Sequence, residues 1–135
     1  GLVSSISNLC RRYARLTGRL VCFVERAEEC PMPELQQLCL YRAMQAALKM
    51  FADSDNDMMI VSCDRIGDRN VIIVRCVDKR VSSAQWLSVE KPEFAAFESW
   101  CNMAGAETEI GTMHYRGFPC DLIITVAAGD KEQTT

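Results

Sequence analysis

The segment from Pro33 to Ala52 is predicted to form one long helix whose apolar side chains lie on two different faces. The first face repeats at three- and four-residue steps, as in a helix packed on a core: Leu35, Leu38, Tyr41, Met44, Leu48 and Phe51. The second face consists of Cys39, Ala43, Ala46, Ala47 and Met50, where a surface helix would normally be polar. Either another part of the protein covers this second face, or polar groups have been lost from it.

Periodicity and turn residues predict the elements around this helix. Residues 4–17 are expected to be a helix that serines can cap and that Gly18 ends. Strands are predicted at 19–25, 58–63, 70–77, 107–115 and 120–127, with the second and third joined as one hairpin and the last two as another. Residues 92–105 form a third predicted helix, with proline at its start and glycine at its end.

This order predicts an α/β fold, a two-layer α/β sandwich with a mixed sheet of about five strands and three helices on one face. A chain of 135 residues fits one compact domain, which we place at residues 1–128, followed by a flexible polar tail at 129–135. The mixture of hairpins and crossovers argues against a doubly wound sheet, and no glycine-rich nucleotide loop of the common kinds is present.

Charge and hydropathy exclude two classes of partner. The net charge is −3 and no long basic tract occurs, so nucleic acid is not expected to bind. No apolar run approaches the ~18 residues of a membrane span, so this domain itself is not expected to contact a membrane.

The chain has eight cysteines, which fall singly within apolar segments. No CxxC pair occurs, and His114 has no cysteine near it, so the spacing of a zinc site is absent and no metal is expected. We interpret the thiols as small buried side chains in a reducing cytoplasm.

Several phrases, together with the order of elements, resemble the ATP-binding catalytic domain of sensor histidine kinases, the histidine-kinase-like ATPase fold. "RLTGRLVCFV" at 15–24 is similar to the family's helix end and following strand, and "LYRAMQAAL" at 40–48 is similar to the phrase that opens its asparagine-bearing helix. "VIIVRCVD" resembles the strand that delivers the adenine-binding aspartate, here Asp78, and residues 92–127 resemble the closing helix and hairpin.

The same resemblance shows which chemical groups are missing. Where the family has a glutamate that polarises water or the acceptor, this chain has Ala46, and where it has the asparagine that holds magnesium, this chain has Met50. Both glycines that should follow Asp78 are also absent, in "DKRVSSAQW". Asp78 is therefore a candidate adenine contact, Ala46 and Met50 are degenerate nucleotide-facing positions, and no catalytic residue is identified.

We therefore expect a degenerate ATP-binding-type domain, a pseudokinase that acts as a structural or protein-interaction module in two-component-type signal transduction. Its partner would be a protein in a signalling assembly, including the rest of its own chain, and no cofactor is expected. One alternative is a functional domain that binds ATP and magnesium and transfers phosphate to a histidine on another region. Another is a small-molecule binding module that uses the emptied nucleotide pocket.

Overall fold

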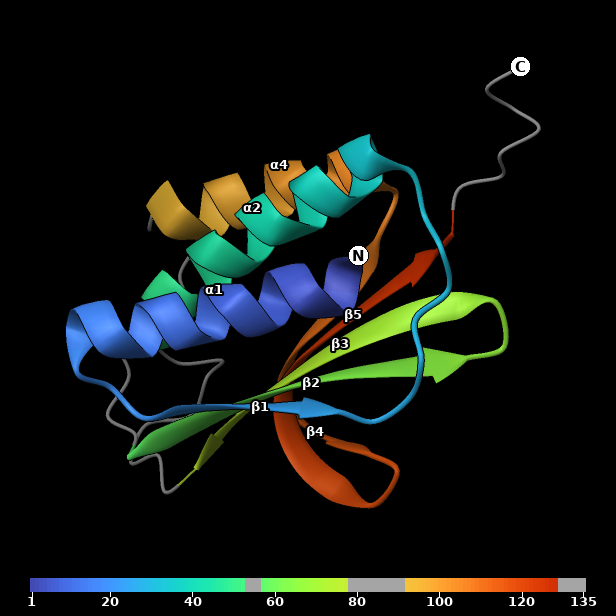
Figure 1. Ribbon diagram of the computed structural model, residues 1–135. Helices are drawn as coiled ribbons and strands as arrows, with labels where there is room; N and C mark the ends of the chain where they lie inside the picture. Colours follow the sequence, from blue (N-terminus) through green and yellow to red (C-terminus); the bar gives the residue numbers. More distant parts are fainter. Residues whose placement is uncertain (53–56, 78–91, 129–135) are drawn as a thin grey trace.

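The computed structural model describes residues 1–52, 57–77 and 92–128, which form one mixed sheet with three helices on one face (Figure 1). The helices are α1 (Leu2–Thr17), α2 (Glu34–Ala52) and α4 (Pro92–Ala104). The strands are β1 (Val21–Glu25), β2 (Met58–Ile66), β3 (Arg69–Val77), β4 (Glu107–Tyr115) and β5 (Phe118–Ala127). The predicted fold class and strand number are confirmed.

The sheet has the strand order β1-β2-β3-β5-β4. β1 pairs with β2 in parallel, and every other pairing is antiparallel. Both predicted hairpins form, because two-residue turns, Gly67-Asp68 and Arg116-Gly117, join β2 to β3 and β4 to β5. Gly67 has a positive φ of 62°, a backbone region that glycine enters without steric cost.

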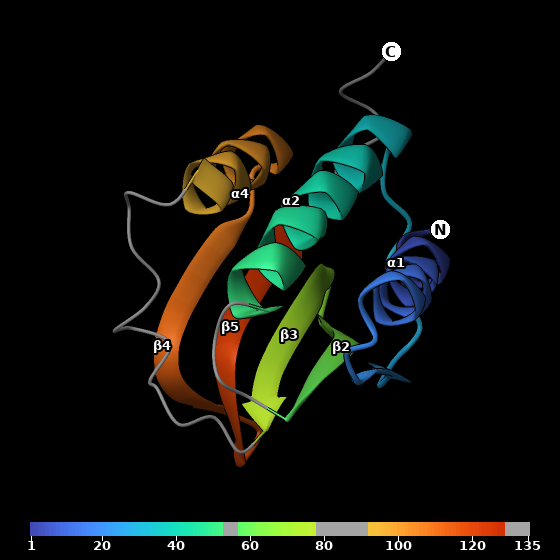
Figure 2. The same ribbon diagram turned by 90° about the vertical axis from the view of Figure 1, so that its left-hand side faces the viewer.

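The main core lies between the sheet and the helices. Alternate residues of the strands, such as Met59, Val61, Ile72 and Leu122, point toward the helix layer and are fully buried. α2 lies in the middle of that layer, with α1 along one side and α4 along the other (Figure 2). A helix in this position is covered on three sides, which accounts for its two apolar faces.

One prediction for this helix is wrong. Leu35 and Leu38, which were expected in the core, are 69% and 47% exposed. Both lie in the first turns of α2. The apolar period of three and four residues continues to the helix start, but no described element buries these two side chains.

The start of α1 also differs from the prediction. The helix begins at Leu2, and no serine caps it. Instead the carboxylate of Glu29, from the segment between β1 and α2, accepts hydrogen bonds from the backbone N–H groups of Leu2 (2.6 Å) and Val3 (3.1 Å). A carboxylate is the charge that a helix N-terminus favours. The far end matches the prediction, because Gly18 adopts a left-handed φ of 73° and its N–H donates to Ala14.

A second, smaller core lies on the face of the sheet opposite the helices. It contains Val71, Ile73, Tyr115 and Cys120, with Met113 and Ile123 packed against it. A bulge between Ile110 and Met113, where Gly111 has a φ of 135°, bends the β4–β5 hairpin. The pairing of β3 with β5 stops at Leu122, and the next residue, Asp121, accepts the Cys76 N–H through its side chain (2.8 Å). The hairpin end therefore leaves the sheet and folds across its open face.

All eight cysteines lie in the described residues as free thiols, and seven of them are buried. Burial raises the pKa of Cys10, Cys63 and Cys101 to about 12, because the charged thiolate loses its hydration. These thiols are therefore neutral and weakly nucleophilic at pH 7. Only Cys22, on the edge strand β1, is exposed.

Candidate functional site

Ala46 and Met50, the two positions that the resemblance puts beside a nucleotide, lie one turn apart on the same side of α2. Met50 is fully buried in the main core, whereas Ala46 is 8% exposed and borders a groove. Their neighbours Ala43 and Ala47 are also fully buried. Met50 does not line the groove that Ala46 borders. The second apolar face of α2 is therefore part of the core, and it forms no open apolar patch.

The groove beside Ala46 runs between α2 and α4 and has a volume of about 520 Å³. α2 lines it with Arg42, Gln45, Ala46 and Lys49, and α4 lines it with Pro92, Glu93, Ala96 and Trp100. Arg42 donates a hydrogen bond to the Gln45 side chain (3.0 Å), which keeps the guanidinium along the helix. The groove is thus bordered by two cations (Arg42 and Lys49), one carboxylate (Glu93) and the indole of Trp100.

This groove offers binding contacts but few reactive groups. Glu93 is the carboxylate in its lining, and the amide oxygen of Gln45, the other hard-oxygen side-chain group there, already accepts a hydrogen bond from Arg42. Across residues 1–52, 57–77 and 92–128 no three histidine, cysteine or acidic side chains gather as a metal would require. Asp78, the candidate adenine contact, lies outside the described residues.

A second groove, of about 300 Å³, separates α1 from α2. Leu9, Tyr13, Leu16 and Tyr41 give it an apolar lining, and Arg12, Arg42 and Lys49 lie among them. Leu16 is 78% exposed, an unusual degree of exposure for a leucine beside other apolar groups. Tyr13 is held in place because its hydroxyl donates to the Leu48 carbonyl of α2 (3.2 Å). The outer surface of α1 and α2 is thus apolar in its groove and basic around it.

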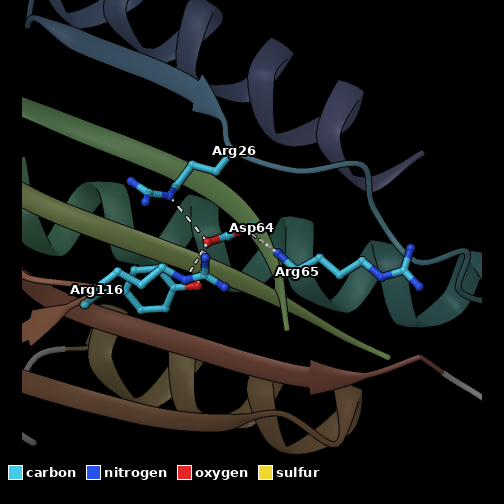
Figure 3. A network of polar contacts seen from close by, with 5 residues as sticks. Arg26, Asp64, Arg65 and Arg116 are labelled. Atoms are coloured by element: carbon cyan, nitrogen blue, oxygen red, sulfur yellow. Dashed lines mark hydrogen bonds and ion pairs between the residues drawn. The ribbon is translucent and has the colours of Figure 1, made fainter. Parts of the chain in front are cut away.

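A network of polar contacts lies on the opposite face of the sheet (Figure 3). At its centre is Asp64 of β2, which is only 5% exposed. Its Oδ2 accepts a hydrogen bond from the Tyr115 hydroxyl (2.7 Å) and lies 3.4 Å from Arg26 Nε and 3.5 Å from Arg116 Nε. Its Oδ1 accepts from the backbone N–H of Arg65 (2.7 Å), whose own side chain extends away from the cluster. One buried carboxylate therefore joins β2 to the end of β1 and to the β4–β5 turn.

This environment shifts the pKa values of Asp64 and Tyr115. Burial alone would raise the pKa of Asp64, but the hydrogen bonds from Tyr115 and Arg65 and the charges of Arg116 and Arg26 outweigh it, so the pKa is lowered. For Tyr115, burial first and then Asp64 raise the pKa above its ordinary value. The pair is therefore a carboxylate that accepts a hydrogen bond from a neutral phenol at pH 7.

Sequence reasoning did not find this network. Arg26, Asp64 and Tyr115 come from three separate strands or strand ends, and no short motif connects them. Two sequence signals could have pointed to it. An aspartate within the apolar alternation of β2 is expensive to bury unless it has partners, and Arg116-Gly117 marks a hairpin turn that places its side chain close to the sheet.

The fold defined here is that of histidine kinase catalytic domains. The histidine kinase domain of a blue-light activated histidine kinase from Erythrobacter litoralis superposes on 94% of this chain with a TM-score of 0.73 at 12% identity. This chain spans 61% of that structure. The catalytic domain of histidine kinase ThkA matches 94% of this chain, and 91% of its own length is covered, with a TM-score of 0.61 at 8% identity.

The mycobacterial sensor histidine kinase MprB gives a TM-score of 0.62 at 9% identity, with 93% of each chain covered. No protein-family model matches the sequence, and no curated protein matches it. Identities this low show a common fold alone. The resemblance found in the sequence is thereby confirmed at the level of the fold. None of the helices in the described ranges is long and apolar enough to cross a bilayer.

Proposed function

We propose that this chain is a degenerate ATP-binding-type domain of a sensor histidine kinase, that it does not transfer phosphate, and that it acts as a protein-interaction module in two-component signal transduction. The observation that carries this proposal is the complete burial of Met50 at the position where the resembled family has its magnesium-binding asparagine. A cytoplasmic location agrees with eight free thiols, because a reducing compartment preserves them.

The chemistry of α2 supports the loss of nucleotide binding. Magnesium requires hard oxygen ligands in an octahedral shell, and the thioether of Met50 is soft and enclosed by the core. Ala46 has no group that could move a proton or polarise a water. Without a metal, triphosphate charge would lie beside apolar side chains and lose hydration. We therefore infer that neither ATP nor magnesium is a cofactor of this domain.

Isothermal titration with Mg-ATP tests this part of the proposal. We expect no saturable heat of binding at nucleotide concentrations up to 1 mM. This upper concentration is sufficient because a Kd of 1 mM corresponds to a binding free energy of only about 4 kcal/mol. A histidine kinase catalytic domain that is known to bind Mg-ATP serves as the positive control. A micromolar Kd for this chain would contradict the proposal and support a functional kinase domain.

The interaction surface that we assign is the groove between α1 and α2. Its apolar lining with Leu16 and Tyr41 suits the apolar stripe of a helix, and Arg12, Arg42 and Lys49 select against basic partners. The occupant that fits this pattern is an acidic amphipathic helix of a signalling protein, either separate or elsewhere in the same polypeptide.

A pair of synthetic helices tests this surface. One carries leucines at i, i+3, i+4 and i+7 with glutamates elsewhere, and the other replaces each glutamate with lysine. In two-dimensional NMR we expect only the acidic helix to shift the amide signals of α1 and α2, and the double variant R42E/K49E should bind it at least tenfold more weakly. R69E, on β3 and outside the lining of the α1–α2 groove, serves as the control. Equal binding of both helices, or shifts confined to the sheet, would contradict the assignment.

A further inference from the structure

A hollow of about 130 Å³ lies on the face of the sheet opposite the helices, where the β4–β5 hairpin folds over it. β1, β2 and β3 line it with Val24, Ile60, Ser62, Ile73 and Arg75, Arg26 borders it at the end of β1, and the hairpin closes it with Tyr115, Phe118, Pro119 and Cys120. It is separate from both helix grooves, since the whole sheet lies between them. Its existence therefore does not depend on the function proposed above.

The charges around this hollow do not balance. Asp64 is the carboxylate of the cluster, and it already contacts Arg26 and Arg116. The Arg26 guanidinium also lies over the rings of Tyr115 (5.8 Å) and Phe118 (5.6 Å), which orients it along the wall. Arg75 projects from β3 into the same lining, and among the described residues no carboxylate pairs with it. The guanidinium groups of Arg26 and Arg75 thus line the hollow, and among the described residues no carboxylate lines it, which leaves an excess of positive charge at its wall.

The remaining lining is apolar and specific in shape. Val24, Ile60 and Ile73 form one side, and Phe118, which is 55% exposed, forms part of the rim on the other. A cavity with apolar walls and a few placed polar groups is the common form of a small-molecule site. A protein cavity of roughly 150 Å³ holds one benzene molecule, so a hollow of about 130 Å³ suits a compact ligand.

We propose that this hollow binds a small organic anion, a monocarboxylate with a compact apolar body. The carboxylate would accept hydrogen bonds from the Arg75 guanidinium and the Ser62 hydroxyl, which line the hollow together. The apolar body would pack between Ile60, Ile73 and the Phe118 ring. A larger anion such as a nucleotide would extend well beyond a hollow of about 130 Å³, and a cation is disfavoured by Arg26 and Arg75, which line it.

Benzoate is a suitable probe, because it joins a carboxylate to one ring. Titration of the isotopically labelled domain with benzoate, followed by two-dimensional NMR, should shift the amides of Ser62, Arg75 and Phe118 with a Kd in the range from tens of micromolar to a few millimolar. Benzyl alcohol, which has the same ring but no charge, should bind at least tenfold more weakly. Equal binding of the two compounds would overturn the proposal.

Two variants of the same strand separate the site from a general charge effect. R75Q should weaken benzoate binding at least tenfold. R69Q removes an arginine from the same face of β3, six residues (about 20 Å) away, and should change the Kd by less than twofold. Unchanged binding to R75Q, or shifts that map to the helix layer, would overturn the proposal. Because no nucleotide enters these measurements, they are independent of the Mg-ATP titration.

Discussion

The hydroxyl of Tyr115 lies 2.7 Å from Oδ2 of Asp64 and joins the turn of the β4–β5 hairpin to β2, 51 residues earlier in the chain. The two strands are not neighbours, because β3 and β5 lie between β2 and β4 in the sheet. The contact is possible because the bulge at Gly111 bends the hairpin across the open face. This hydrogen bond therefore holds the closure that creates both the second core and the hollow beside it.

Replacement of Tyr115 by phenylalanine tests that role. The ring would still pack in the second core, but buried Asp64 would lose one hydrogen-bond donor. We expect the free energy of unfolding to fall by about 1–3 kcal/mol, the usual loss for a hydrogen bond to a charged group. Urea unfolding followed by circular dichroism measures it. Y41F is the control, since Tyr41 lies at the helix surface, and it should cost less than about 0.5 kcal/mol.

The lowered pKa of Asp64 predicts how stability depends on acid. As the pH falls below about 4, the unfolded chain takes up this proton before the folded chain does. The stabilisation from Asp64 is therefore complete above that pH and is lost as the pH falls through the lower pKa of the folded state. D64N should be less stable at pH 7 and should lose less stability between pH 6 and pH 3. Parallel pH curves for the two proteins would contradict this prediction.

The side chain of Asn70 makes a second polar contact that is predicted to be essential for stability. It is 1% exposed, and its side chain accepts from the Cys30 N–H (2.7 Å) and donates to the Cys30 carbonyl (2.9 Å). N70A would leave both backbone groups buried without a partner and should lower the free energy of unfolding by about 2–4 kcal/mol. N102A, at an exposed position of α4, is the matched control and should have little effect. Equal unfolding midpoints for N70A and the unmodified protein would contradict this role.

Substitutions of the turn residue Arg116 separate the effect of backbone conformation on stability from the effect of charge. It has a φ of 49°, a region that asparagine tolerates and β-branched residues avoid. R116N and R116V both remove the ion pair between Arg116 and Asp64. The side chain of Arg116 is half exposed, so this ion pair contributes little to stability. We expect R116N to stay within about 0.5 kcal/mol of the unmodified protein and R116V to lose about 1–2 kcal/mol. Thermal unfolding of the two variants compares them directly, and equal losses would refute the backbone explanation.

Sequence patterns predicted most of the architecture because each element has a local signal. The local signals include alternation along β2, the apolar run of β3, the glycine after α1 and the proline at the start of α4. Each of them depends only on near neighbours in the chain. The errors arose where a distant residue decided the outcome. Glu29 caps α1 in place of a serine, and among the described elements none buries Leu35 and Leu38.

By itself, the sequence determined the fold class, the three helices and the five strands, since hydrophobic period and turn residues act over a few positions. It also determined that positions 46 and 50 offer a methyl group and a thioether, because side-chain chemistry needs no fold. Only the tertiary structure decided that α4 covers the second face of α2. The tertiary structure also brought Arg26, Asp64 and Tyr115 together, because contacts between residues so far apart depend on how strands pair and bend.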